Sequence, residues 1–420
     1  MMIHARTLKR IAASGAAAIA FACAAMPAQA QLKINLIDNG SVGGTPAELG
    51  FRIAAGYWES VISTDVTINL GIGYSVLPPG IIGSTGSAAY GVATEDVIAS
   101  LQAVGNSALD ASAILPTLST TTYSGLHGVS MIRNGPLNAN GTGINLNTVG
   151  YDSSQSLNNV ALAVNEANLK ALGYTGFDGG NDADITFSSV FSFDFNPFDG
   201  ITAGQMDFIG VAIHEIGHAL GFTSGVDVYD QLAGVGPGAS VGAGVNWNNQ
   251  IVGSVLDLFR YSNDPVNVIP KVGAALDWSV GTAAYFSLDG GATQFNGESL
   301  FATGYYNGDG DQASHFKDTA ASVGGCNGYN QIGIMDPTFC YGEMGVISAL
   351  DLAAMDAIGW NLNLDVLANN GYTINTKEIY RAATGVPEPT TWGTMLLGFG
   401  LVGGFIRRRR DQKAGVLLAA

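Results

Sequence analysis

Residues 214–222 restrict what this chain can fold into more than any other segment. They read His-Glu-Ile-Gly-His-Ala-Leu-Gly-Phe. On an α-helix, His214 and His218 lie one turn apart on the same face, with the Glu215 carboxylate beside them, which is an arrangement that binds zinc and activates water. Gly221 predicts that the helix ends at once and that the chain then turns to bring in a third ligand. The extended form of this pattern has a histidine at the next ligand position, where this chain has Ser224.

The first 30 residues have the organisation of a secretory signal peptide. A basic start precedes an apolar run over residues 11–26, and residues 27–30 read Pro-Ala-Gln-Ala, which contains an Ala-x-Ala cleavage site. An N-terminal membrane anchor is the weaker alternative, because the apolar run is short and ends in a processing site. We therefore expect export, removal of residues 1–30 by signal peptidase, and a mature chain that begins at Gln31.

The C-terminus has three parts in a characteristic order. Pro387, Glu388 and Pro389 come first, an uncharged and largely apolar stretch covers residues 390–406, and four arginines follow at 407–410. The apolar stretch is at the lower limit for a transmembrane helix, since the bilayer core is about 30 Å thick. The arginines would hold its end at the cytoplasmic side.

This tail closely resembles the PEP-CTERM sorting signal of Gram-negative bacteria. The resemblance implies that an exosortase-type enzyme removes residues 387–420 as the protein moves to the cell surface or the medium. The chain would then be attached to the inner membrane only transiently.

The remaining chain is strongly acidic. Residues 31–386 contain nine Lys and Arg against 32 Asp and Glu, a net charge of about −23. This charge argues against nucleic acid or anionic membranes as partners and suits an extracellular protein. The acidic clusters 178–184 and 309–311 offer the oxygen ligands that Ca²⁺ prefers, although solvated loops explain them equally well. Of the three cysteines, Cys326 and Cys340 remain after the signal peptide is removed, and a single disulfide is their simplest interpretation in an oxidising compartment.

Hydrophobic periodicity predicts an α+β protein. Strands are predicted over residues 31–37, 66–74, 185–187, 190–195, 251–258 and 285–288. Helices are predicted over residues 47–63, 94–103, 157–172 and 346–359, in addition to the helix that carries His214. Residues 366–386 lose periodicity and are predicted to form a spacer before the sorting tail.

Few residues qualify as the third metal ligand. Outside the signal peptide the histidines are His127, His214, His218 and His315. His315 is the preferred candidate because it precedes Met335 in the segment Gly-Ile-Met-Asp-Pro. The leading alternative is Asp227, with Asp230 and His127 far behind.

Together these residues resemble leishmanolysin-type metzincins, a family of zinc endopeptidases. That family has His-Glu-x-x-His-x-x-Gly-Phe, a long insertion, a third histidine, and then a Met-turn whose thioether supports the histidines without binding the metal. The resemblance covers residues 200–360, with His315 as the delayed ligand and Met335 in the Met-turn. It implies a mixed twisted sheet plus an active-site helix, divided into an N-terminal catalytic subdomain (31–221), an insertion (222–314) and a C-terminal subdomain (315–365). Position 337 departs from the family, since it is Pro337 where some metzincins have tyrosine.

The resemblance also implies a reaction, the hydrolysis of a peptide bond by a zinc-bound water. His214, His218 and His315 would hold one Zn²⁺, and Glu215 would act as the general base that later protonates the leaving amine. A strand from residues 185–195 is expected to pair with an extended protein or peptide substrate. The rival hypothesis is a non-enzymatic extracellular matrix or surface protein that keeps a structural zinc site, and the presence of Glu215 weighs against it.

Overall fold

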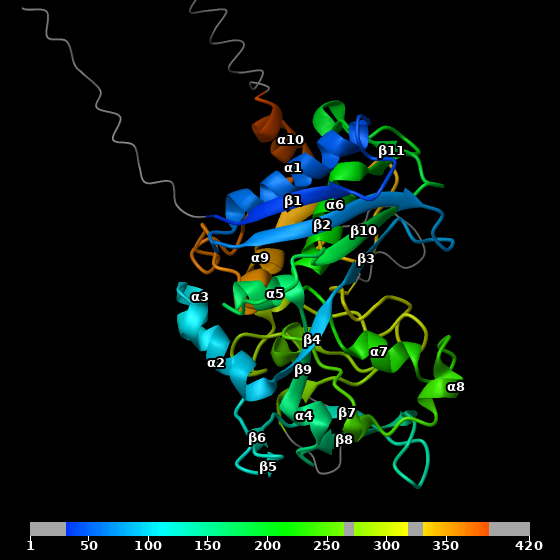
Figure 1. Cartoon of the computed structure of the whole chain (residues 1–420), viewed down its shortest axis with the longest axis vertical. Helices are drawn as coiled ribbons and strands as arrows, with labels where there is room; N and C mark the ends of the chain where they lie inside the picture. Colours follow the sequence, from blue (N-terminus) through cyan, green and yellow to red (C-terminus); the bar gives the residue numbers. More distant parts are fainter. Residues whose placement is uncertain (1–30, 264–272, 318–330, 386–420) are drawn as a thin grey trace, which may run out of the picture. The chain divides into compact units, whose positions relative to one another are not determined.

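The computed structural model describes residues 31–263, 273–317 and 331–385, drawn in colour in Figure 1. This part of the chain is a mixed α+β protein, as the periodicity predicts. The signal peptide, Cys326 and the whole sorting tail with Pro387, Glu388 and Pro389 lie outside the described residues.

The strands and helices alternate along the chain. The strands are β1 (Lys33–Asp38), β2 (Thr67–Ser75), β3 (Gly83–Ser87), β4 (Ala89–Ala93), β5 (Thr122–Tyr123), β6 (Leu126–His127), β7 (Met131–Gly135), β8 (Asn145–Asp152), β9 (Ala161–Asn165), β10 (Ala183–Ser188), β11 (Phe193–Asp194), β12 (Met206–Asp207), β13 (Arg260–Ser262), β14 (Ala275–Asp277), β15 (Tyr285–Phe286), β16 (Val346–Ser348) and β17 (Thr373–Asn375). The α-helices are α1 (Pro46–Val61), α2 (Thr94–Val104), α3 (Ala108–Ser112), α4 (Leu157–Val160), α5 (Glu166–Ala171), α6 (Phe208–Ala219), α7 (Val226–Gln231), α8 (Ala239–Gly242), α9 (Ala349–Ala357) and α10 (Thr376–Thr384). Short 3₁₀ turns are η1 (Pro197–Asp199), η2 (Trp247–Asn249), η3 (Leu256–Phe259) and η4 (Phe295–Gly297).

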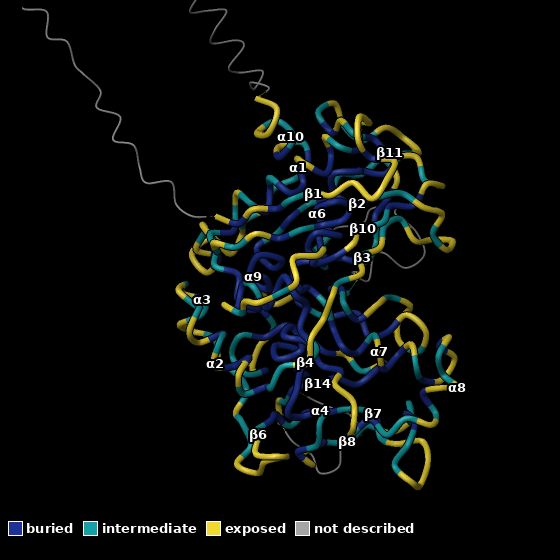
Figure 2. Tube along the Cα trace, viewed as in Figure 1, coloured by how far each residue is buried: buried dark blue, intermediate teal, exposed yellow. Residues whose placement is uncertain are grey.

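A four-stranded sheet supports the helix that carries His214. Its strand order is β1-β2-β10-β3, with β1, β2 and β10 parallel and β3 antiparallel to β10. Helices α1 and α6 pack against each other and against this sheet. Phe51 of α1, Phe187 of β10 and Phe208 of α6 form an aromatic cluster. The ring centroid of Phe187 lies 5.0 Å from that of Phe51 and 4.5 Å from that of Phe208. This burial of apolar surface, visible as the dark interior in Figure 2, holds α6 on the sheet.

Strand β3 lies at an edge of this sheet, and β10 does not. Both sides of β10 are paired, one with β2 and the other with β3. The prediction that a strand from residues 185–195 receives the substrate is therefore wrong for β10, because its backbone groups already bond to neighbouring strands. The edge nearest α6 belongs to β3, which sequence periodicity did not identify because its residues read Gly-Ser-Thr-Gly-Ser.

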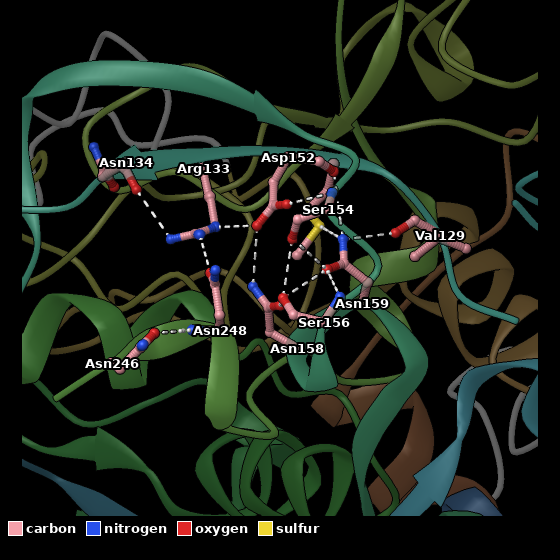
Figure 3. A network of polar contacts seen from close by, with 11 residues as sticks. Val129, Arg133, Asn134, Asp152, Ser154, Ser156, Asn158, Asn159, Asn246 and Asn248 are labelled. Carbon is pink, nitrogen blue, oxygen red and sulfur yellow. Dashed lines mark hydrogen bonds and ion pairs between the residues drawn. The ribbon is translucent and has the colours of Figure 1, made fainter. Parts of the chain in front are cut away.

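A second sheet joins segments that the sequence patterns treated as separate. Its order is β15-β13-β14-β7-β8, so three strands from the predicted insertion (222–314) continue a sheet that begins in residues 131–152. Side chains reinforce this junction (Figure 3). Arg133 Nε donates to Asp152 Oδ2 over 2.5 Å, and its guanidinium also donates to the side chain of Asn248 in η2. The predicted insertion (222–314) thus shares a sheet with the N-terminal half and does not form a separate unit.

Asparagine side chains complete the same polar network. Asn159 Nδ2 donates to the Val129 carbonyl over 3.0 Å, and Asn158 Nδ2 donates to Asp152 Oδ2 over 3.3 Å. These amides begin α4, where Ser156 and Asn159 form a capping box. The helix ends after one turn at Val160, because Ala161 is extended and begins β9. The single helix predicted over residues 157–172 is accordingly wrong, since β9 separates α4 from α5 and pairs with β4.

Two further predictions are corrected by local side-chain chemistry. Residues 251–258 do not form a strand, because the Asp257 carboxylate binds the amide of Ser254 and the chain turns into η3. Residues 366–385 are not an unstructured spacer. They contain β17, which pairs with β16, and α10, whose N-terminus is capped by Asn375 and whose Ile379 is buried. The predicted helix over 346–359 begins three residues later, at Ala349, after β16.

Candidate metal centre

Helix α6 places His214, Glu215 and His218 together. Asp207 caps its N-terminus by accepting from the amide of Gly210 over 3.1 Å, and Trp58 Nε1 donates to the Ile213 carbonyl over 3.0 Å. The helix ends at Ala219, and Gly221 follows with φ +115°. A Cβ at Gly221 would lie 2.9 Å from the side chain of Asn168, so both conformation and space favour glycine there.

The side chains of His214, His218 and His315 meet at their Nε2 atoms. The Nε2 separations are 3.0 Å between His214 and His218, 3.1 Å between His218 and His315, and 3.2 Å between His315 and His214. His214 and His315 are 6% and 7% exposed and His218 is only half-buried, so solvent can reach the cluster at His218. The structure thus brings the remote histidine to the helix, and these are the only grouped candidate ligands among the described residues.

A backbone carbonyl fixes the orientation of each ring. His214 Nδ1 lies 2.7 Å from the Ile334 carbonyl, His218 Nδ1 lies 2.7 Å from the Phe222 carbonyl, and His315 Nδ1 lies 3.1 Å from the Gln312 carbonyl. A carbonyl only accepts, so each Nδ1 carries the hydrogen and each Nε2 presents a lone pair. Carbonyls behind metal-binding imidazoles select the tautomer in this way.

The electrostatics of the cluster keep the imidazoles neutral. Burial lowers the pKa of His214 to about 3 and that of His218 to about 4, with the charge of His218 contributing at His214. Burial and the two neighbouring histidines also lower the pKa of His315 well below its ordinary value. Three neutral rings that point their lone pairs at one another repel, unless a cation lies between them.

The donor set fits zinc. Tetrahedral ligands at about 2.0–2.1 Å from one Zn²⁺ are roughly 3.3 Å apart. The three Nε2 separations of 3.0–3.2 Å approach this value. Three protein ligands leave a fourth position for a water or a substrate, which is the ligand count of catalytic zinc sites.

Met335 lies beneath the ligands and is fully buried. A Cβ at Gly217 would be only 2.5 Å from Met335 Sδ, so the thioether packs against the helix between His214 and His218. Asp351 of α9 holds this turn by accepting from the amides of Ile334 and Met335 over 2.8 and 3.0 Å. The turn therefore supports the site twice, through its thioether and through the Ile334 carbonyl that orients His214.

Glu215 points to strand β3. Its Oε2 accepts from Thr85 Oγ1 over 2.6 Å, and a Cβ at Gly83 would lie 2.5 Å from its Oε1. Burial raises the pKa of Glu215 to about 7, and the bond from Thr85 opposes that rise. The carboxylate thus lies between α6 and the edge strand of the sheet, beside the helix face that carries His214 and His218.

The alternative ligands have other partners. Asp227 accepts from Ser314 and Ala313, and Asp230 accepts from the amides of Tyr306 and Asn307. His127, on β6, lies 2.8 Å from the Ser119 carbonyl. None of these three residues belongs to the cluster of His214, His218 and His315.

Protein donors also bind the carboxylates of the acidic clusters 178–184 and 309–311, the candidate calcium sites. Asp309 pairs with Lys317 over 2.9 Å, and Asp184 accepts from the side chains of Asn39 and Asn181. Asp182 pairs with Lys170 over 2.6 Å. Calcium binding at either cluster has no further support from these contacts.

Cys340 is disulfide-bonded and almost completely buried. Its predicted partner, Cys326, lies outside the described residues. Cys340 is five residues after Met335, so the bond constrains the chain just beyond the Met-turn.

A cleft of about 860 Å³ lies away from the metal centre. It opens between α2, α3 and residues 113–118, with Phe259 and Ala357 in its wall. The three histidines do not line it, and its shape therefore carries no argument about their chemistry.

Several residues of the centre escaped sequence reasoning. Gly83, Thr85 and Ser314 carry no motif, and these three and Asp351 reach the site only through tertiary contacts. The one local signal was Ser348-x-x-Asp351, a capping-box spacing that predicts the start of α9 but not a bond to the Met-turn.

Comparison with known proteins identifies the C-terminal tail. Residues 385–410 match the family described as the PEP-CTERM protein-sorting motif. The chain is therefore an exported protein with a surface or membrane-associated sorting signal of the kind found in Gram-negative bacteria, and the motif implies processing by an exosortase-type enzyme. No described helix is long and apolar enough to cross a membrane, and the predicted membrane stretch 390–406 lies outside the described residues. No curated protein and no solved structure matches the chain, so the metzincin resemblance of residues 200–360 stays a prediction.

Proposed function

We propose that this exported chain is a zinc-dependent endopeptidase with a metzincin-like centre formed by His214, His218 and His315. The observation that carries the proposal is the convergence of three Nε2 atoms, 3.0–3.2 Å apart, with each Nδ1 facing a carbonyl. Zinc held there would supply a positive charge that lowers the pKa of a coordinated water and polarises a substrate carbonyl.

Glu215 has the position of a general base. It follows His214 on α6, is 5% exposed, and is held by Thr85 at the edge strand. A carboxylate in such a seat accepts a proton from the attacking water and returns it to the leaving amine. A purely structural zinc site has no use for this group.

Strand β3 offers a place for an extended peptide. It lies at the edge of its sheet, and Thr85 at its centre contacts Glu215. A substrate that pairs with this edge would run past the metal-binding face of α6. We expect a substrate-analogue peptide to slow backbone hydrogen exchange in residues 83–87, and unchanged exchange at saturating peptide would contradict this placement.

The main test combines zinc content with proteolysis. The purified chain, its Glu215→Gln and His315→Ala variants, and a Glu59→Gln control on α1 would be compared for bound zinc and for cleavage of a denatured protein. We expect Glu215→Gln to keep zinc and lose activity by at least about 100-fold, and His315→Ala to lose both. Full activity in Glu215→Gln would refute the mechanism.

The rival function is a non-enzymatic surface protein with a structural zinc site. The observation on its side is the Thr85 bond of the buried Glu215, because a carboxylate that joins α6 to β3 has a structural role that needs no catalysis. Stoichiometric zinc without cleavage of any denatured protein, together with a Glu215→Gln variant that is only altered in stability, would support this rival.

A further inference from the structure

The loop that carries His315 is bound to a carboxylate far away in the sequence. Asp227, in the first turn of α7, accepts from the Ala313 amide at Oδ1 over 2.6 Å and from the Ser314 amide at Oδ2 over 3.0 Å. The Ser314 hydroxyl donates to the same Oδ2. Three donors on the two residues just before His315 thus converge on one half-buried carboxylate.

The same loop is bound at position 224, where the extended zinc motif has its third histidine. The amide of Ser224 donates to the Ser314 hydroxyl over 2.8 Å. The Ser224 hydroxyl donates to Asp257 over 2.6 Å, and the amide of Gly225 donates to the same carboxylate over 2.7 Å. Asp257 therefore fixes the chain segment that leaves α6, and Ser314 is hydrogen-bonded to that segment.

A buried arginine holds the two ends of the His315 loop. Arg260 is 1% exposed and donates to the Ala302 carbonyl over 2.9 Å and to the Ala313 carbonyl over 3.4 Å. The amide of Ala302 in turn donates to the His315 carbonyl over 3.0 Å. Asp227 binds the amides of this loop while Arg260 binds its carbonyls, so the backbone before His315 is held on both sides.

We infer that Asp227 is the positioning residue of the displaced ligand, acting through Ala313 and Ser314 to place His315 Nε2 against His214 and His218. The extended zinc motif has a metal ligand at position 224. In this chain, Ser224 and Asp227 instead hold the loop that carries the third histidine, His315. The inference rests on the proposed metal centre, but it does not require peptide hydrolysis.

A double-mutant cycle tests this role on the purified exported chain. Asp227→Asn, His315→Ala and the double variant would be compared for Zn²⁺ affinity by chelator competition and for the absorption spectrum with Co²⁺ in place of zinc. We expect Asp227→Asn to weaken Zn²⁺ binding by about 10- to 100-fold and to change the Co²⁺ spectrum toward that of His315→Ala. In the His315→Ala background, the same change should cost less than about twofold, because its effect passes through His315.

Asp194→Asn is the matched control. Asp194 also accepts two amides and one hydroxyl, from Asn196 and Thr202, but its loop holds no residue of the metal centre. We expect this variant to keep wild-type Zn²⁺ affinity. Ser314→Ala is the second variant if Asp227→Asn does not fold, and we expect it to weaken Zn²⁺ binding by several-fold while leaving the two backbone bonds.

Two results would overturn the inference. One is wild-type Zn²⁺ affinity and Co²⁺ spectrum in both Asp227→Asn and Ser314→Ala. The other is equal loss of affinity from Asp227→Asn with and without His315, which would make Asp227 an independent contributor. Absence of peptidase activity in the wild-type chain would refute the proposed function and leave this metal-binding result interpretable.

Discussion

Two parts of the molecule contribute the three histidines of the candidate metal centre, and different interactions position each part. Helix α6 presents His214 and His218 through helical periodicity alone, because residues four apart share a face. His315 lies on a loop whose position depends on hydrogen bonds to Asp227, Arg260 and Ser224. The helix would keep its two histidines aligned if it were moved, whereas the loop is placed only by the fold around it. Loss of polar anchors should therefore damage the second part far more than the first.

Asp351→Ala should have the largest effect on stability. The Asp351 carboxylate accepts from the amides of Ile334, Met335 and Ser348, all in or beside buried segments. Its removal leaves these donors unpaired, and we expect a loss of about 3–5 kcal/mol in the free energy of unfolding, since each unpaired buried group costs about 1–3 kcal/mol. Urea unfolding of the metal-free proteins measures it.

Asp365→Ala is the control for that measurement. Asp365 is exposed and accepts from the amide of Ala368 in a surface turn. Its loss should cost about 1 kcal/mol or less. Similar losses for the two aspartates would mean that the Met-turn does not depend on its buried carboxylate.

The contrast between helix and loop also explains what could be predicted from the sequence. The ligand spacing on α6 and the helix end at Gly221 follow from local rules, as do α1, α2, β1 and β2, whose periodic residues face the core. His315 and Met335 were selected because few histidines remain and because the motif order resembles a known family. Asp227, Asp351 and Thr85 could not be assigned, because an aspartate or threonine reveals its partner only after distant segments have packed together.

Gly83→Ala tests whether Glu215 depends on the sheet edge. The added Cβ would lie 2.5 Å from Glu215 Oε1, so the carboxylate must move. We expect peptidase activity to fall by about 10- to 100-fold with zinc content unchanged, because a displaced base reacts poorly. Gly86→Ala on the same strand is the control, since no atom lies within 4 Å of its added Cβ. Equal activity of the two variants would show that activity does not depend on the contact between Gly83 and the Glu215 carboxylate.

Gly217→Ala probes the contact between the two parts of the centre. The new methyl would lie 2.5 Å from Met335 Sδ, and the thioether must shift beneath the histidines. Overpacking should outweigh the gain in helix propensity, giving a net loss of about 1–2 kcal/mol and weaker Zn²⁺ binding. Gly56→Ala on α1 has open space around its Cβ and should instead gain about 0.5–1 kcal/mol. A stabilised Gly217→Ala variant with wild-type zinc affinity would show that Met335 does not brace the helix.

Asp356→Asn should give a change in stability whose size depends on pH. Asp356 lies on α9 with Asp351, but neither of its buried oxygens accepts from a backbone amide. Burial, followed by the charge of Asp110, raises its pKa from 3.8 to about 7, with Ser107 opposing. Between those values the folded chain binds a proton that the unfolded chain releases, so stability falls as pH rises through this window and the loss is complete above pH 7.

Asparagine at position 356 stays neutral, so its advantage over the wild type should grow with pH. We expect almost no difference near pH 4 and about 1 kcal/mol or more of added stability at pH 8, measured by urea unfolding at both values. A difference that is constant with pH would show that Asp356 is paired when charged. The expected result would show that the two aspartates of α9 differ in their effect on stability because only Asp351 accepts hydrogen bonds from backbone amides. Asp351 accepts from three amides and holds the turn at Met335, whereas Asp356 accepts from none and makes the fold less stable at neutral pH.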